Sequence, residues 1–315
     1  MHNRSRLTDA AAKRQKYGNT TLLVATLGAL VCIVGLFLTQ YIGLWAVAAG
    51  GAAIAASIVV AAVLVDPYEK RFYEAFCEEY LYPELDEVFS NYEYLPTKGM
   101  SARELREMAV VPSLRRHVAR CLLRGHIRGT HVSTCHLLYA KDQRVNKKSK
   151  LPREAIATVE GQALRLKGIK LSAPSLWIRP RGVYETEGVR VRNKRPEMLL
   201  VGAGTQEFQN VFEALSPDID AAAEFLDEAF CHKLLRLREI VKFMSPNSGL
   251  FIRLRGDCCE LFISNWDNGC MPTMKDTMSS AYFEKCAVYT VAMADSCVRL
   301  LEPGSDYAFN PEVEL

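Results

Sequence analysis

The strongest constraint in this 315-residue sequence is a run of 46 residues, Thr20–Val65, that contains no acidic, basic or histidine side chain. A short polar break at Thr39–Gly43 divides the run into apolar halves of 19 and 22 residues. A helix needs about 20 apolar residues to cross roughly 30 Å of hydrocarbon. Because a soluble helix of this length normally has a polar face, the pattern predicts a two-helix transmembrane hairpin over residues 20–65.

Charge on either side of the run predicts its orientation. Residues 1–19 carry five basic side chains and one acidic one, Lys70 and Arg71 follow the run, and the break between its halves is uncharged. Both termini are therefore expected to be cytoplasmic. In the second half a small residue at every fourth position leaves homo-oligomerisation through that helix open, beside packing within the hairpin; this stripe is Ala49, Ala53, Ser57 and Ala61. The ten cysteines have no framework spacing, so free thiols are expected.

The rest of the chain is divided by charge. Residues 66–112 have a net charge of −6, residues 113–196 of +15 and residues 197–315 of −10. One interpretation pairs the basic segment with its acidic flanks, and the other brings it to anionic lipid headgroups or an acidic protein partner. The candidate basic face consists of Arg179, Arg181, Arg190, Arg192, Lys194 and Arg195. Nucleic acid is disfavoured as a partner, since aromatic residues are sparse among these cations.

Helix signals lie on both sides of the basic segment. Asp66-Pro67 begins a predicted juxtamembrane stalk with aromatic residues at helical spacing, which Pro83 should end or kink. Ser101 followed by Glu104 predicts a capping box and a short helix toward Val110. Further on, Asp218 predicts the start of a helix that continues to Val241, and a last long helix is expected between Pro272 and Pro303.

Strand signals occupy the basic segment and the middle of the last third. Cys121–Ile127 and His131–Tyr139 form one predicted hairpin, with a helix over 114–125 as the alternative. Ser175–Tyr184 with Val189–Asn193, and Leu250–Arg255 with Cys258–Ser264, form two more. The predicted fold class is α+β: an N-terminal two-helix transmembrane hairpin followed by a cytoplasmic domain of antiparallel β-hairpins packed with long helices. Its predicted parts are a basic tail at 1–19, the hairpin at 20–65, the stalk at 66–112, the α+β domain at 113–304 and a disordered tail at 305–315.

A resemblance extends over residues 20 to about 300. It is carried by the two apolar halves, the Gly125–Thr130 strand and turn, Phe208 with Phe212, the helix pattern after Ser216, and the hairpin at Leu250–Phe262. These features resemble the bacterial membrane proteins of the domain-of-unknown-function 3137 family. The resemblance implies a cytoplasmic α+β domain on a membrane hairpin in the bacterial inner membrane, and it implies no reaction.

Three kinds of reactive site were sought in the sequence. A metal site among Cys121, His126, His131, Cys135 and His136 is disfavoured, because alternation along a strand separates Cys135 from His136. Cys231-His232 adjacency does not make a nucleophile and its base. Gly202–Thr205 lacks the remainder of a phosphate-binding loop.

No catalytic residue, metal or cofactor is therefore assigned. The sequence favours an integral membrane protein whose cytoplasmic domain is an interaction module for anionic lipid headgroups or a protein partner. The alternative is an enzyme of unknown chemistry acting on a membrane-associated substrate.

Overall fold

The computed structural model describes residues 66–110, 117–141, 157–182, 198–266, 280–305 and 307, together with scattered helical positions between 12 and 59. The chain divides into two compact units. The first comprises Met1–Pro83 with Met274–Phe283, and the second comprises Glu84–Thr273 with Glu284–Leu315. All of the described strands belong to the second unit.

Within the described residues no helix combines the length and the apolar character needed to cross a membrane. The transmembrane hairpin predicted over residues 20–65 is therefore wrong as a part of the fold, whereas the α+β character is confirmed. The two longest described helices are α9 (Glu228–Met244) and α10 (Ser280–Leu301). Both carry charged residues, which are costly in hydrocarbon. The prediction relied on the length, apolar character and charged flanks of residues 20–65, most of which lie outside the described residues.

A continuous helical segment does begin at Asp66. It consists of α4 (Asp66–Phe76), the π-helical η2 (Cys77–Leu81) and α5 (Tyr82–Val88). The predicted helix is thus confirmed, but Pro83 does not end it. The Tyr82 N–H donates to the Cys77 carbonyl five residues earlier. A proline ring clashes with the carbonyl four residues before it in an α-helix, and the wider π turn before Pro83 lets the helix continue.

The predicted aromatic spacing produces a cluster within the first unit. The ring of Phe283 has its centroid 6.0 Å from that of Phe72, 6.2 Å from that of Phe76 and 5.7 Å from that of Tyr80. Phe72 and Phe76 are fully buried. Aromatic pairs in this distance range contribute about 0.5–1.5 kcal/mol beyond the area they bury. The cluster therefore fastens the start of α10 to α4 and η2.

The second unit is built on one antiparallel sheet of nine strands, in the order β1-β2-β3-β4-β9-β8-β5-β7-β6. The strands are β1 (Ser90–Leu95), β2 (His117–Ile127), β3 (Thr130–Lys141), β4 (Ala157–Lys167), β5 (Ala173–Pro180), β6 (Leu199–Val201), β7 (Phe212–Ser216), β8 (Gly249–Gly256) and β9 (Cys258–Ser264). The predicted hairpins β2–β3 and β8–β9 are confirmed. In the first of them Arg128 and Gly129 have φ values of 49° and 82°, as two-residue hairpin turns of this kind require.

Other parts of the sheet differ from the sequence prediction. β1 and β4 were not predicted, although β4 lies between β3 and β9. The strand expected at Ser175–Tyr184 forms as β5, but its described partners are β7 and β8. Its expected partner, Val189–Asn193, lies outside the described residues. Local sequence signals thus predicted β5 itself. Its neighbours in the sheet depend on pairing with segments that are distant in sequence.

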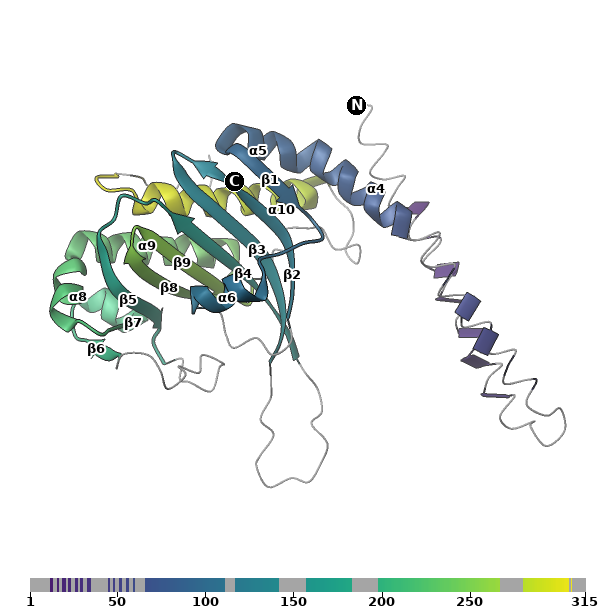
Figure 1. Cartoon of the computed structure of the whole chain (residues 1–315), viewed down its shortest axis with the longest axis horizontal. Coiled ribbons are helices and arrows are strands. Elements are labelled where there is room, and N and C mark those ends of the chain that lie inside the picture. Colours follow the sequence, from purple (N-terminus) through teal and green to yellow (C-terminus); the bar gives the residue numbers. More distant parts are fainter. Residues whose placement is uncertain are drawn as a thin grey trace, which may run out of the picture. The chain divides into compact units, whose positions relative to one another are not determined.

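Helices cover both faces of the sheet (Figure 1). α9 and the second-unit part of α10 lie on one face, and the short α6 (Ala102–Met108) lies on the opposite face. The helix predicted from Asp218 to Val241 is divided into α8 (Ile219–Phe225) and α9. The division occurs because the Asp227 side chain accepts a 2.7 Å hydrogen bond from the Phe230 N–H and caps a new helix. α7 (Gln206–Val211) precedes β7.

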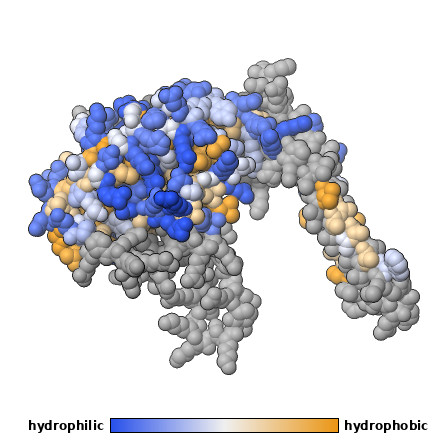
Figure 2. Space-filling view, viewed as in Figure 1, coloured by the Kyte–Doolittle hydropathy of each residue, from blue (hydrophilic) through white to orange (hydrophobic). Residues whose placement is uncertain are grey.

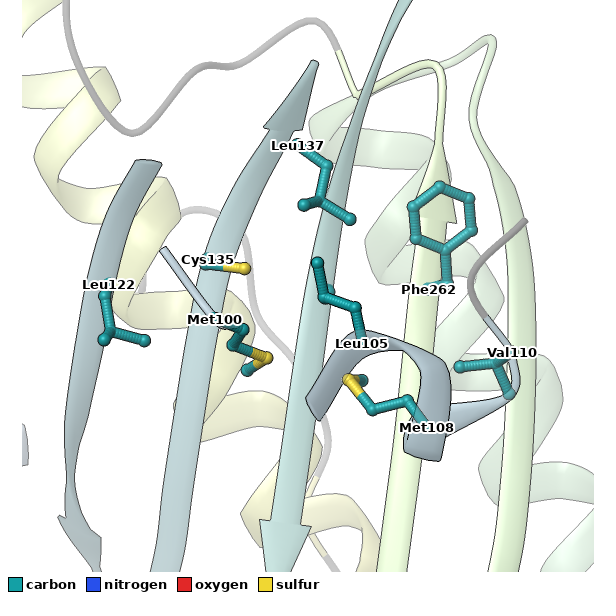
Figure 3. Close-up of a cluster of buried hydrophobic side chains, with 9 residues drawn as sticks. Met100, Leu105, Met108, Val110, Leu122, Cys135, Leu137 and Phe262 are labelled. Atoms are coloured by element: carbon teal, nitrogen blue, oxygen red, sulfur yellow. The ribbon is translucent and has the colours of Figure 1, made fainter. Parts of the chain in front are cut away.

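A hydrophobic core lies beneath α6 (Figure 3). Leu105 and Met108 of α6, with Met100 before the helix and Val110 after it, point toward the sheet. They pack on buried side chains from β2, β3, β4 and β9, which are Leu122, Cys135, Leu137, Ala163 and Phe262. This core fixes α6 on the face of the sheet that carries the candidate site, which we call the α6 face.

Candidate anion-binding face

The predicted capping box at Ser101 is confirmed and sets the start of α6. The Ser101 hydroxyl accepts a hydrogen bond from the Glu104 N–H at 3.2 Å, and the Glu104 carboxylate accepts one from the Ser101 N–H at 2.7 Å. The same carboxylate lies 2.6 Å from the guanidinium of Arg124 on β2. Glu104 therefore holds the helix start and ties it to the sheet.

An ionic cluster beneath the other end of α6 is almost completely buried. The Glu260 carboxylate on β9 lies 3.0 Å from the Arg165 guanidinium on β4 and 3.3 Å from that of Arg253 on β8. The side chains of Glu260 and Arg165 are only 9% and 10% exposed, respectively. Burial raises the pKa of Glu260, against the lowering effect of the two guanidiniums. A buried charge is tolerated only when it is paired and hydrogen-bonded, and this cluster meets that condition.

Both arginines of this cluster also bond to the backbone of α6, Arg165 in its first turn and Arg253 at its end. Arg165 donates to the Glu104 carbonyl at 3.1 Å, and Arg253 donates to the carbonyls of Glu107 and Met108 at 2.9 and 3.3 Å. The last carbonyls of a helix have no partner within the helix and carry partial negative charge. A helix of seven residues is thus held on the sheet at both ends by charge-assisted hydrogen bonds.

The charge of Glu104 gives a pH prediction. Partial burial raises its pKa, but the hydrogen bonds from Ser101 and the charges of Arg124 and Arg165 hold the pKa of this carboxyl below its ordinary value. A lowered pKa in the fold contributes stability above the unfolded value, and this stability is lost as the pH falls through the folded value. We expect Glu104→Gln to cost about 1 kcal/mol at pH 7, and this cost should shrink as the pH is lowered toward 3.

Urea unfolding of both proteins between pH 7 and pH 3 measures this difference. Glu224→Gln, at an exposed position on α8, is the matched control and should show no pH-dependent cost. A cost of Glu104→Gln that stays constant across the pH range would contradict the assignment.

Beyond the ionic cluster, five neighbouring strands place a second line of polar side chains on the α6 face. His126 on β2 is opposite His131 on β3, which is opposite Lys167 on β4. Lys167 is in turn opposite Cys258 on β9, which is opposite Arg255 on β8. Directly opposed residues of an antiparallel sheet point to the same face. We call these five residues the cationic row.

The members of the cationic row reach the surface. Lys167 and Arg255 are exposed, and His126, His131 and Cys258 are partly exposed. Figure 2 shows hydrophilic residues gathered over the part of the sheet where α6 lies. The adjacent ionic line has three arginines, Arg124, Arg165 and Arg253, against two glutamates, Glu104 and Glu260. The α6 face therefore carries excess positive charge before either histidine is protonated.

The basic face predicted from the sequence is only partly described. Arg179 lies on β5 and forms an ion pair with Glu213 of β7 at 2.9 Å. Arg181 follows the strand, is exposed, and donates to the Gln209 carbonyl at 2.7 Å. The other four predicted residues, Arg190, Arg192, Lys194 and Arg195, lie outside the described residues. Both described members thus have partners within the fold.

Pairing of the basic segment with its acidic flanks is confirmed for several arginines. Four ion pairs join residues 113–196 to the flanking segments, and in each of them a glutamate comes from a flank. They are Arg124–Glu104, Arg128–Glu302, Arg165–Glu260 and Arg179–Glu213. Neither Lys167 nor Arg255 has an ion pair among the described residues. Sequence reasoning missed this pair of cations because their alignment depends on the β4–β9 pairing, which no local pattern indicates.

The reactive sites considered from the sequence are not assembled. Cys135 is buried under α6, whereas His136 is on the other face and lies 3.5 Å from Glu160. Cys231 is buried with a raised pKa caused mainly by burial, and His232 is exposed beside Glu228. The described residues contain no group of three or more potential metal ligands. Gly202–Thr205 is a turn, and Thr205 caps α7.

Among the cysteines that the structure describes, one differs from the sequence expectation. Seven of them are free thiols, and all of these are buried except the partly exposed Cys258. Cys121, at the bulge in β2, is disulfide-bonded. The expectation that every cysteine is a free thiol is therefore wrong for Cys121.

Comparison with known proteins does not identify the chain. No family model, no curated protein and no solved structure matches it. The resemblance to the domain-of-unknown-function 3137 family stays a prediction, and the functional conclusion depends on the chain's own geometry.

Proposed function

We propose that this chain is an interaction module that binds anionic lipid headgroups at a membrane surface through the cationic row. The single observation that supports this proposal is the alignment of Lys167 and Arg255 with two histidines across five adjacent strands. Five strands have four spacings of about 4.8 Å, so the row extends over roughly 19 Å. Such a length suits several headgroups of an anionic surface better than one small molecule.

The fold supplies a rigid platform for this contact. Strands β3, β4 and β9 pair over their lengths, and the core beneath α6 lies on the same face next to the row. The neighbouring arginines are neutralised in part by Glu104 and Glu260, whereas Lys167 and Arg255 remain exposed. Each basic residue close to an anionic membrane contributes about 1 kcal/mol to binding. Two such lysine and arginine side chains give a weak, salt-sensitive attraction.

An interaction module is favoured over an enzyme by where the reactive residues lie. The nucleophile and base candidates considered from the sequence are separated by the sheet or buried apart from each other. Cys258 lies inside the cationic row, but its pKa is raised by burial and by Glu260, against the lowering effect of Arg165, Lys167 and Arg255. A raised thiol pKa disfavours the reactive thiolate at neutral pH.

Co-sedimentation of the full chain with vesicles tests the proposal. We expect the double variant Lys167→Gln/Arg255→Gln to bind phosphatidylglycerol-containing vesicles about thirty-fold more weakly than the unchanged protein, from about 1 kcal/mol per cation. The matched control is Arg236→Gln/Lys285→Gln, which removes the same charge from exposed positions on α9 and α10. Binding should also weaken as salt is raised.

The quantity compared is the difference between anionic and neutral phosphatidylcholine vesicles. This difference removes the contribution of uncharged segments such as residues 20–65. Equal loss of binding in the two double variants, or equal binding to both kinds of vesicle, would reject the proposal. Binding of a soluble acidic peptide without vesicle binding would reject a lipid surface in favour of an acidic protein partner.

A further inference from the structure

We infer that His126, His131 and Lys167 form a phosphate-binding corner within the cationic row, and that binding of a phosphate group there takes up a proton. This inference rests on the proposed function, since the phosphate of a lipid headgroup is one source of the ligand. A free phosphodiester in solution is the other source. The chemistry that recognises both is the same, a phosphate oxygen held between an ammonium group and imidazole N–H groups.

The two histidines meet at the end of the β2–β3 hairpin. His126 and His131 are directly opposed across the strands, and their ring centroids are 5.2 Å apart with an interplanar angle of 80°. Only the turn residues Arg128 and Gly129 separate β2 from β3, so the backbone holds both rings in a short, rigid hairpin end. Lys167 is opposed to His131 on its other side. Three nitrogen-bearing side chains from three strands therefore occupy adjacent positions on the same face.

The ring of His131 is only partly satisfied in the fold. Its Nδ1 is buried and has no hydrogen-bond partner among the described residues. Buried polar atoms without a partner are rare, and each of them invites a functional explanation. The residue as a whole remains partly exposed, so part of it can be reached from the surface.

The charges around His131 provide the coupling to protons. Its pKa is lowered, first by burial and then by His126, Lys167 and Arg124, against the raising effect of a contact with its own backbone. The same positive neighbours attract an anion, and an anion bound among them reverses the electrostatic cost of protonating the ring. The pKa of His131 must then be higher in the complex than in the free protein. By linkage, affinity is greatest below the free pKa and falls as the pH rises through the bound pKa.

The other charged groups near this corner either form ion pairs within the fold or lie at other positions of the sheet. On β2, Arg124 is engaged by Glu104 of α6 at 2.6 Å, and in the turn Arg128 lies 3.8 Å from Glu302. Cys258 and Arg255 continue the row on β9 and β8, and Glu93 on β1 is opposed to Arg124 rather than to a histidine. Among the described side chains at this corner, imidazole is thus the only kind whose ordinary titration range lies near neutral pH.

Vesicle binding by the full chain at pH 5.5 and pH 8.0 tests the inference. Phosphatidylglycerol is the appropriate lipid, because its phosphodiester keeps one negative charge over this range and adds no titration of its own. We expect tighter binding at pH 5.5, by up to about tenfold for each unit by which the bound pKa exceeds the free pKa.

Three variants separate the corner from other histidines. His126→Gln/His131→Gln should bind equally at both pH values, whereas His232→Gln, at an exposed site on α9, should keep the full pH dependence. His131→Arg keeps its positive charge throughout, so it should bind tightly at both pH values. Circular dichroism melts identify any variant that does not fold. If the double variant does not fold, His131→Gln alone provides the test, and at least half of the pH dependence should be lost.

Soluble glycerophosphoglycerol, which is the same headgroup without chains, distinguishes the two ligand sources. Its binding is followed by the NMR resonance of the His131 Cε1–H, which reports protonation of the ring. A resonance shift without vesicle binding would support the corner and reject the lipid surface. Vesicle binding that depends on Lys167 and Arg255 but not on pH would keep the proposed function and overturn this inference. An unchanged pH dependence in His126→Gln/His131→Gln would also overturn it.

Discussion

Replacing Glu260 with glutamine is expected to lower the free energy of unfolding by about 3 kcal/mol, because breaking a buried ion pair leaves an uncompensated charge. Two guanidiniums would lose their counter-charge in a site where the side chains of Arg165 and Arg253 are only 10% and 17% exposed. Glutamine has nearly the volume of glutamate, so the loss reports on charge rather than on a cavity. The same arginines donate to backbone carbonyls of α6, and the helix should loosen with them.

Urea unfolding of the full chain measures this cost, with Glu213→Gln as the matched control. Glu213 also pairs with an arginine, Arg179, but their side chains are 24% and 31% exposed. The control should therefore cost less than about 1 kcal/mol. Adding Arg165→Met to Glu260→Gln should recover part of the loss, since it removes one unpaired cation. A cost of Glu260→Gln no larger than that of the control would show that the cluster does not hold this face together.

The second large effect concerns the packing of Gly161 against Phe262. A methyl group added at Gly161 would lie 2.7 Å from two ring carbons of Phe262, which is fully buried under α6. Gly161→Ala is expected to cost about 1–3 kcal/mol by overpacking. Phe262→Ala is expected to cost about 3–5 kcal/mol through the lost ring and the cavity it leaves. Phe243→Ala, at a position that is 53% exposed, is the control for loss of a phenylalanine ring.

The two substitutions should not be additive. In Gly161→Ala/Phe262→Ala the added methyl group occupies space that the ring has left, so the double variant should be more stable than the sum of the single costs predicts by about 1 kcal/mol. Thermal or urea unfolding of the four proteins measures this coupling. If the stability costs of the two substitutions are strictly additive, the Phe262 ring can move away from β4 and make room for the added methyl group without loss of stability.

Local signals in the sequence predicted local structure well. The capping box at Ser101, the cap at Asp218 and the turn at Gly256-Asp257 form as expected, and the turn expected at residues 128–130 forms with Thr130 already in β3. Each of these depends on hydrogen bonds or backbone angles within a few residues. The chemistry of one short segment is therefore enough to predict them.

What sequence reasoning missed depends on pairing between distant segments. β4 has few local turn signals and is recognised as a strand only through β3 and β9. The cationic row follows from the same pairings, because Lys167 and Arg255 are 88 positions apart in sequence. The basic face was instead assigned to a stretch of neighbouring cations, of which the two described members are bound within the fold. The membrane hairpin failed for a related reason, since apolar composition was treated as sufficient for one structure.

The strand order also determines when each strand can meet its partner during synthesis. β4 ends at Lys167, but its partner β9 begins only at Cys258, about 90 residues later. At translation rates of about 5–20 residues per second, roughly 5–20 s pass before that partner leaves the ribosome. Through this interval the edge of β4 has no partner strand, and α6 lacks the part of its packing surface that β9 supplies. Completion of β9 closes the edge, positions Glu260 between its arginines and allows the α6 face to form in one late step.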